Sequence, residues 1–230
     1  MRAVITGANR GIGLELVRQL SARGYDVVGG VRDVGAASEL RALGGRVRVL
    51  AVDVTNGDSV AAFARELGDA PVDLVVNNAG WAGGDTQSLR QMADDLSLAD
   101  VNRAFEINAM GALRVSVALL PNVRAGTGKK YVHITSGMGS IADNGSGGYY
   151  AYRMSKAALN MMSMSLAVDL KPEGILSVVI NPGWVQTNMG GSRAPTPVDE
   201  SVRSILARID EVTLADTGAF LNWKGGRYPW

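Results

Sequence analysis

The sequence predicts an α/β fold: one mostly parallel, doubly wound sheet of seven strands with helices on both of its faces. Two observations support this prediction. Along the 230 residues, short apolar runs alternate with segments of helical periodicity, and the connections between them are short. The sequence also has neither an internal repeat nor a linker, so we expect residues 1–230 to form a single domain.

Seven apolar runs bounded by turn residues predict the strands, which cover residues 2–6, 26–31, 47–52, 74–77, 129–135, 176–181 and 219–223. Apolar residues at helical spacing predict helices over 14–20, 56–67, 98–123, 149–170 and 198–209, with Asn56 as an expected N-cap. The stretch 137–148 is rich in Gly, Ser and Asn and indicates a flexible loop beside the substrate. We expect residues 183–230 to supply a further substrate loop and the last strand.

Composition excludes several classes of function. Lys and Arg number 23 against 22 for Asp and Glu, which removes the electrostatic motive for binding nucleic acid or an anionic membrane. The chain has no cysteine and one histidine, His133, so we expect no metal site, and we interpret His133 as a core residue. A strand begins at Arg2 and no apolar run is long enough to span a bilayer, so we expect a cytoplasmic protein.

A glycine-rich turn lies between the first strand and the first helix. This order is typical of a phosphate-binding loop, because glycines let the backbone approach a pyrophosphate and the helix N-terminus directs amide hydrogens at it. The turn therefore predicts a Rossmann-type dinucleotide site, with a turn that binds nothing as the alternative. The residues expected to contact the pyrophosphate are Gly7, Asn9, Arg10, Gly11, Ile12 and Gly13.

Two arginines indicate which dinucleotide is bound. The second strand ends at Val31 and is followed by Arg32, where an NAD enzyme would place a carboxylate against the ribose hydroxyls. Arg10 in the glycine turn can converge on the same point. Two guanidinium groups and no carboxylate favour a ribose with a 2′-phosphate, so we expect NADP(H). Two solvated surface arginines are the alternative interpretation.

Further coenzyme contacts are expected where the third and fourth strands end. Asp53 and Val54 come at the end of the third strand, near the expected position of the adenine. Asn78, Ala79 and Gly80 follow the fourth strand, and small residues there let the backbone pass close to a coenzyme. Turn formation is the alternative role for Asn78.

Tyr152 and Lys156 lie four residues apart on a predicted helix, so they share one face. A free phenol titrates near ~10, and an ammonium about 4 Å away would bring its pKa towards neutrality. A phenol tuned in this way gives a proton to a carbonyl oxygen or takes one from an alcohol. An ordinary surface pair is the alternative. Ser136 lies upstream, at the carboxyl end of the fifth strand, where open α/β sheets place ligand chemistry.

Taken together, these motifs resemble the short-chain dehydrogenase/reductase family over essentially the whole chain. The resemblance rests on residues in family order: Thr6-Gly7-x-x-x-Gly11-x-Gly13, Asn77-Asn78-Ala79-Gly80, Asn108, Ser136, Tyr152-x-x-x-Lys156 and Pro182-Gly183. Residues 147–160, 183–191 and 229–230 look like the subgroup of sniffer-type carbonyl reductases and bacterial C-factor proteins.

The resemblance implies an NADP(H)-dependent oxidoreductase that reduces a ketone or aldehyde, or oxidises the alcohol. By family role, Tyr152 exchanges the proton, Lys156 lowers the pKa of the phenol, and Ser136 binds the carbonyl. Asn108 would anchor a water that links Lys156 to a proton relay. Contacts with the nicotinamide half of the coenzyme are expected from Tyr152, Lys156, Pro182, Gly183, Val185 and Thr187.

One spacing departs from the family pattern, because Ser136 and Tyr152 lie a few residues further apart than usual. By spacing alone, Ser140 is an alternative partner for Tyr152. Tyr149 sits at the common distance from Ser136, but Arg153 and not a lysine stands four residues after it. We therefore expect Tyr152 to be the catalytic tyrosine and the extra residues to widen the loop.

Other readings of the same residues stay open. A signalling or sensor protein that binds NADP(H) with little turnover is the main alternative, and dehydration or epimerisation on the same fold is another. We expect a homodimer or homotetramer packed through helices 98–123 and 149–170. The residues expected to line the substrate site, unless they belong to the core, are apolar or aromatic: Trp81, Met138, Ile141, Tyr149, Trp184 and Met189.

Overall fold

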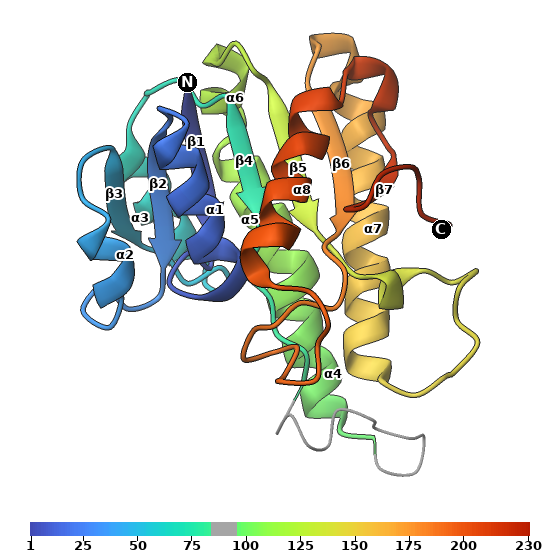
Figure 1. The fold of residues 1–230 in the computed structure, drawn as a ribbon. Coiled ribbons are helices and arrows are strands. Elements are labelled where there is room, and N and C mark those ends of the chain that lie inside the picture. The colour runs from blue at the N-terminus through green and yellow to red at the C-terminus, as the bar shows by residue number, and fades with distance from the viewer. Residues whose placement is uncertain (84–95) are drawn as a thin grey trace.

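The computed structural model describes residues 1–83 and 96–230. Its centre is one sheet of seven parallel strands in the order β3-β2-β1-β4-β5-β6-β7 (Figure 1). The strands are β1 (Arg2–Thr6), β2 (Asp26–Val31), β3 (Val47–Ala51), β4 (Leu74–Asn77), β5 (Lys130–Ile134), β6 (Leu176–Asn181) and β7 (Phe220–Asn222). The chain winds outward from β1 first to one side and then, from β4 on, to the other, which confirms the predicted doubly wound sheet.

Helices cover both faces of this sheet (Figure 1). They are α1 (Gly11–Ala22), α2 (Ser38–Ala42), α3 (Gly57–Leu67), α4 (Leu98–Phe105), α5 (Gly111–Ala118), α6 (Leu120–Ala125), α7 (Tyr150–Leu170) and α8 (Val198–Glu211). A π-helical turn, η1 (Glu106–Met110), joins α4 to α5, and short 3₁₀ turns are η2 (Gly137–Gly139), η3 (Lys171–Glu173) and η4 (Leu214–Asp216). Among the described residues, no helix is long and apolar enough to cross a bilayer.

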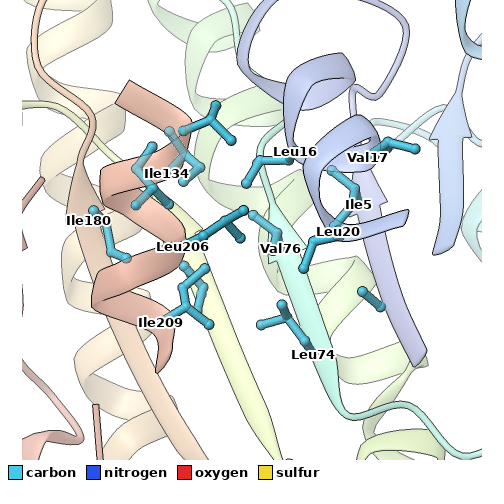
Figure 2. Close-up of a cluster of buried hydrophobic side chains, with 14 of the residues drawn as sticks. Ile5, Leu16, Val17, Leu20, Leu74, Val76, Ile134, Ile180, Leu206 and Ile209 are labelled. Carbon is cyan, nitrogen blue, oxygen red and sulfur yellow. The ribbon is translucent and has the colours of Figure 1, made fainter. Parts of the chain in front are cut away.

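Alternate side chains of each strand enter two separate cores, as the period of two in a strand requires. Ile5 belongs to the core under α1 and α8, whereas its neighbour Val4 faces the core under α3 and α5. Figure 2 shows the first of these cores, where Leu16 from α1 and Leu206 from α8 converge over Val76 of β4. Because both faces are covered, the strands are apolar along nearly their whole length.

The prediction of one continuous helix over 98–123 was wrong. The run changes to π-helical geometry at Glu106–Met110, around Asn108, and it breaks again at Leu119, where φ is −95° and ψ is 2°. The second break has a visible cause. Pro121 is in the first turn of α6, where it has no amide hydrogen to donate and its ring crowds the preceding turn.

Several predicted ends move by one or two residues for local reasons. Lys129 and Tyr149 have left-handed backbone, with φ of 47° and 54°, so β5 begins at Lys130 and α7 at Tyr150. Asn56 is the N-cap of α3, as predicted, and its side chain accepts a hydrogen bond of 2.9 Å from the amide of Ser59. The short helix α2 lacks a counterpart among the predicted elements.

Candidate active site

The glycine turn after β1 is built so tightly that side chains would not fit in it. A Cβ on Gly13 would lie 2.2 Å from the backbone oxygen of Gly7, and one on Gly7 would lie 2.9 Å from Cα of Ala79. Gly7 and Gly11 also have positive φ, at 64° and 52°. The Asn78 amide fixes the turn by donating to the backbone oxygens of Thr6 (3.0 Å) and Gly7 (3.1 Å).

The N-terminus of α1 is electrostatically suited to an anion. Its first turn contains no acidic residue, and its N-cap, Arg10, makes no side-chain capping hydrogen bond. The amide hydrogens of the first turn are therefore available to a ligand, and they lie at the positive end of the helix dipole. Asn9 and Arg10 are exposed beside them. Such a helix end, reached by a glycine turn, can bind a pyrophosphate.

Arg32 and Asp53 lie together at the carboxyl ends of β2 and β3. Hydrogen bonds from Thr55 lower the pKa of Asp53, and the charge of Arg32 lowers it further. Among the described residues, neither Arg10 nor Arg32 has an ion-pair partner. Because neither guanidinium group is in one of the salt bridges of the described residues, both can bind an anionic group.

The segment after β6 lies close to the glycine turn. Gly183 has a φ of 83°, and a Cβ there would lie 2.5 Å from Nε1 of Trp223. Further on, Cγ2 of Thr187 is 3.1 Å from the position of a Cβ on Gly11. Thr187 therefore borders the predicted pyrophosphate site, although it stands 176 positions after Gly11 in the sequence (187 − 11).

The predicted catalytic residues meet between β5, η1 and α7. Lys156 is buried, with 4% of its surface exposed, whereas Tyr152 keeps part of its surface open. Nζ of Lys156 lies 5.6 Å from the centroid of the Tyr152 ring and donates a 2.8 Å hydrogen bond to the backbone oxygen of Ile134. A hydrogen bond links the Tyr152 phenol to Ser136.

Burial dominates the titration of Tyr152 and Lys156. It raises the pKa of Tyr152 to about 12, and the hydrogen bond with Ser136 offsets only part of this rise. Burial also lowers the pKa of Lys156 to about 8. The structure therefore does not support the expectation that Lys156 brings the pKa of the phenol towards neutrality, because the loss of hydration sets the direction of the shift. At neutral pH the phenol carries its proton, as a proton donor must.

The Asn108 side chain is occupied by structural hydrogen bonds. Its oxygen accepts from the amide of Trp81 (2.7 Å), and its nitrogen donates to the Trp81 carbonyl (2.8 Å) and to Oγ of Ser155 (2.8 Å). It thus joins the segment after β4 to α7, next to Lys156. Ser155 was not among the predicted site residues, although its place between Tyr152 and Lys156 was a usable signal.

The residues that competed with Ser136 and Tyr152 have other partners. Ser140 is buried, and its Oγ donates to the backbone oxygen of Trp230 (3.0 Å) and accepts from the amide of Asp143 (3.0 Å). Arg153, four residues after Tyr149, donates to the backbone oxygen of Met138 (3.4 Å) and to Oγ of Ser146 (2.8 Å). The geometry therefore favours Ser136 and Tyr152.

The predicted substrate residues do not belong to the core. Trp81, Met138 and Tyr149 are only partly buried, and the other three are exposed: Ile141 by 80%, Trp184 by 54% and Met189 by 38%. Trp184 is held in place, since its Nε1 donates to the backbone oxygen of Gly190 (2.7 Å). All six side chains are thus open to solvent, at least in part.

Fold and site are those of an oxidoreductase that takes a dinucleotide at the carboxyl edge of a parallel sheet. The model of the short chain dehydrogenase family matches residues 1–197, and the chain belongs to that family. It is 47% identical to the C-signal of Myxococcus xanthus over 169 residues, which are 74% of this chain and 99% of that protein.

Solved structures give the same result. The carbonyl reductase Sniffer of D. melanogaster superposes with a TM-score of 0.93 at 30% identity, covering 100% of this chain and 99% of the other. The NADPH-bound carbonyl reductase from chicken fatty liver superposes with a TM-score of 0.91 at 32% identity, covering 100% and 98%. The resemblance to sniffer-type reductases and C-factor proteins is confirmed.

Proposed function

We propose that the chain is an NADP(H)-dependent carbonyl reductase with Tyr152 as the proton donor. The proposal rests on one observation. Tyr152, Ser136 and Lys156 lie together, beside a turn whose glycine positions leave no room for a side chain. The similar structures support it, because both are described as carbonyl reductases and one of them holds NADPH.

The reduction adds a hydride and a proton to the carbonyl bond. Bound NADPH supplies the hydride. The Tyr152 phenol, protonated at neutral pH, gives its proton to the substrate oxygen, which becomes the hydroxyl of the alcohol. Ser136 hydrogen-bonds the same oxygen and orients it. The ammonium of Lys156 lies close enough to stabilise the phenolate that remains, and solvent then restores the proton.

The test of this mechanism is the oxidation of NADPH by the purified protein with chemically varied ketones, aldehydes and quinones. We expect Tyr152→Phe to lower kcat by a factor of about 10² to 10⁴, the usual contribution of a positioned proton donor. Tyr150→Phe is the matched control, since it removes an exposed hydroxyl two residues away and leaves the pair with Lys156 intact. Equal loss of activity in both variants would contradict the assignment.

The preference for NADP(H) rests on Arg10 and Arg32, both exposed and without an ion-pair partner among the described residues. We expect Arg32→Ala to raise the Kd for NADPH about 10-fold or more, because a charge-assisted hydrogen bond is worth ~1.5–3 kcal/mol. The Kd for NADH should stay unchanged. Arg48→Ala, whose side chain pairs with Glu66, is the control. If Arg32→Ala raised the Kd values for NADPH and NADH by the same factor, a 2′-phosphate site would be contradicted.

A signalling protein that binds NADP(H) with little turnover is the second candidate. The 47% identity to a protein described as C-signal favours it. The same assay separates the two, because a signalling protein would bind NADPH and yet oxidise it with none of the carbonyls. The presence of Tyr152 together with Lys156 and Ser136 supports the enzyme.

We also propose that the chain works as one domain and as a homodimer or homotetramer. Three exposed apolar residues recur at intervals of seven along α7, which places them on one stripe: Met154 (54% exposed), Met161 (67%) and Val168 (66%). Phe105 and Val117, on the neighbouring α4 and α5, are exposed by 42% and 59%. A second copy packed on these helices would bury this surface.

A further inference from the structure

After β7 the chain turns back and runs along the strand that it has just left. The amide of Asn222 donates to the backbone oxygen of Gly226 (3.1 Å), which closes the turn. Arg227 then pairs with Leu221 in an antiparallel bridge, and the amide of Tyr228 donates to Phe220 (2.7 Å). Residues 227–230, here called the return segment, are thereby fixed beside β7 (Figure 1).

Aromatic packing anchors the return segment to the sheet. Phe220 of β7 is 1% exposed. The Tyr228 ring lies 5.0 Å from it and the Trp230 ring 5.4 Å, measured between centroids, and both are tilted. Such pairs contribute beyond the apolar area that they bury. The position of Tyr228 and Trp230 is thus set by the edge of the sheet.

From this anchor the return segment holds the loop that follows Ser136. The hydroxyl of Tyr228 donates to Oδ2 of Asp143 (2.6 Å). The backbone oxygen of Trp230 accepts from the amide of Ala142 (2.7 Å) and from Oγ of Ser140 (3.0 Å). Three hydrogen bonds therefore tie this loop to a segment some 90 residues later in the chain.

Tyr228 also lies directly against the residue after Ser136. A Cβ on Gly137 would be 2.6 Å from the Tyr228 hydroxyl oxygen, so the Tyr228 ring would have to shift to admit a larger residue here. On its other side the loop is held by Arg153, which donates to the backbone oxygen of Met138. The backbone that carries Ser136 is clamped between α7 and the return segment.

We propose that Tyr228 is a positioning residue for Ser136, acting through Gly137 and Asp143. This inference rests on the proposed function. Ser136 must hold the substrate oxygen in line with the phenol of Tyr152, and small displacements of such a group are costly to the rate. The chemistry belongs to the Ser136–Tyr152 pair, and Tyr228 holds one partner of the pair in place.

The first test compares Tyr228→Phe with Arg227→Ala. The phenylalanine keeps the packing on Phe220 and removes only the hydroxyl, whereas Arg227 is an exposed neighbour whose ion pair with Asp216 is 3.7 Å long. For Tyr228→Phe we expect kcat to fall on the order of 10-fold with the KM for NADPH unchanged. Arg227→Ala should leave both at the wild-type values. An unchanged kcat in Tyr228→Phe would overturn the proposal.

The second test does not depend on turnover. Hydrogen exchange, followed by mass spectrometry, should be faster in Tyr228→Phe for the peptide that spans residues 136–143, and unchanged for β1 and α1. If the wild-type protein reduced no carbonyl, the proposed function would fail, while this measurement would still decide whether Tyr228 holds the loop. Unchanged exchange in residues 136–143 would overturn that part.

Asp143 supplies a conservative rescue. Asp143→Ala should reproduce the effects of Tyr228→Phe on kcat and on exchange, and the double variant should be no worse than either single one, because both remove the same bond. Asp143→Asn keeps an acceptor for the Tyr228 hydroxyl and should behave as the wild type. Additive effects in the double variant would contradict a shared path to Ser136.

Discussion

At the scale of single residues, His133 is buried within a directed row of hydrogen bonds. Ser116 donates to the backbone of Ala112, so its oxygen accepts from the Asn77 amide (2.9 Å). The same amide donates to Nδ1 of His133 (3.1 Å), which leaves the proton on Nε2, facing Ser177 (3.2 Å). Burial, with repulsion from Lys156, lowers the pKa of His133 to about 3.

This lowered pKa gives a stability that depends on pH. An unfolded histidine takes up a proton below pH ~6.5 and the folded one does not, so the stabilisation is complete above pH ~6.5 and is lost as the pH falls towards 3. We expect wild-type protein to lose up to about 1.4 kcal/mol per pH unit relative to His133→Gln between pH 6.5 and 4.5, measured by urea unfolding. If the free energies of unfolding of the wild type and His133→Gln changed equally with pH, this assignment to His133 would be contradicted.

Tyr152 and Lys156 show which part of a site can be predicted from residue types. Their spacing on a helix was sufficient to bring the phenol and the ammonium together. The direction of the pKa change was not predictable in this way, because it depends on how much water the fold removes from each group. Hydration is set by residues far along the chain, and a local pattern does not contain it.

At the scale of elements, the segment from α4 to α6 shows the same limit of prediction from a local pattern. Its apolar spacing predicted a helix, and helical residues indeed fill most of it. The π-helical turn at Glu106–Met110 was not predictable from spacing, because its central Asn108 bonds to Trp81 and to Ser155 on α7, which are long-range partners. π-Helical turns are often found at functional sites.

Asn108→Ala tests the role of this turn. It would leave the Trp81 backbone and the Ser155 hydroxyl without their partner, so we expect the free energy of unfolding to fall by about 2–4 kcal/mol. Asn122→Ala is the matched control, because that buried asparagine bonds the backbone oxygens of Gly68 and Ala70 away from the site. Denaturant unfolding should show both variants destabilised, and only Asn108→Ala should also lose kcat in the NADPH assay.

At the scale of the whole molecule, the sheet and its order followed from the alternation of apolar runs and helices, and the structure agrees with the predicted fold class. The clamp on the loop after Ser136 was not foreseen. It joins residues 140–143 to 228–230, and short-range periodicity carries no signal for such a contact. Strand ends were predictable to within about one residue, but the partners that meet at those ends come from the assembled fold.

The apolar stripe on α7 leads to a prediction about assembly. Met161→Glu places a charge at the middle of the stripe, on a side chain that is 67% exposed in one copy of the chain. We expect this variant to keep its fold, by circular dichroism, and to show a lower molar mass in sedimentation than the wild type. Ile141→Glu, equally apolar and 80% exposed but in the loop between η2 and α7, should leave the mass unchanged. A wild-type monomer would refute the proposed interface.

The order of the strands has a consequence for how the protein is made. β2 pairs with β1, β3 with β2, β4 again with β1, and each strand from β5 to β7 pairs with the one synthesised just before it. After β1, every strand finds at least one partner that the ribosome has already released. We expect the growing chain to assemble outward from its first strand, with one new edge available for each strand as it emerges.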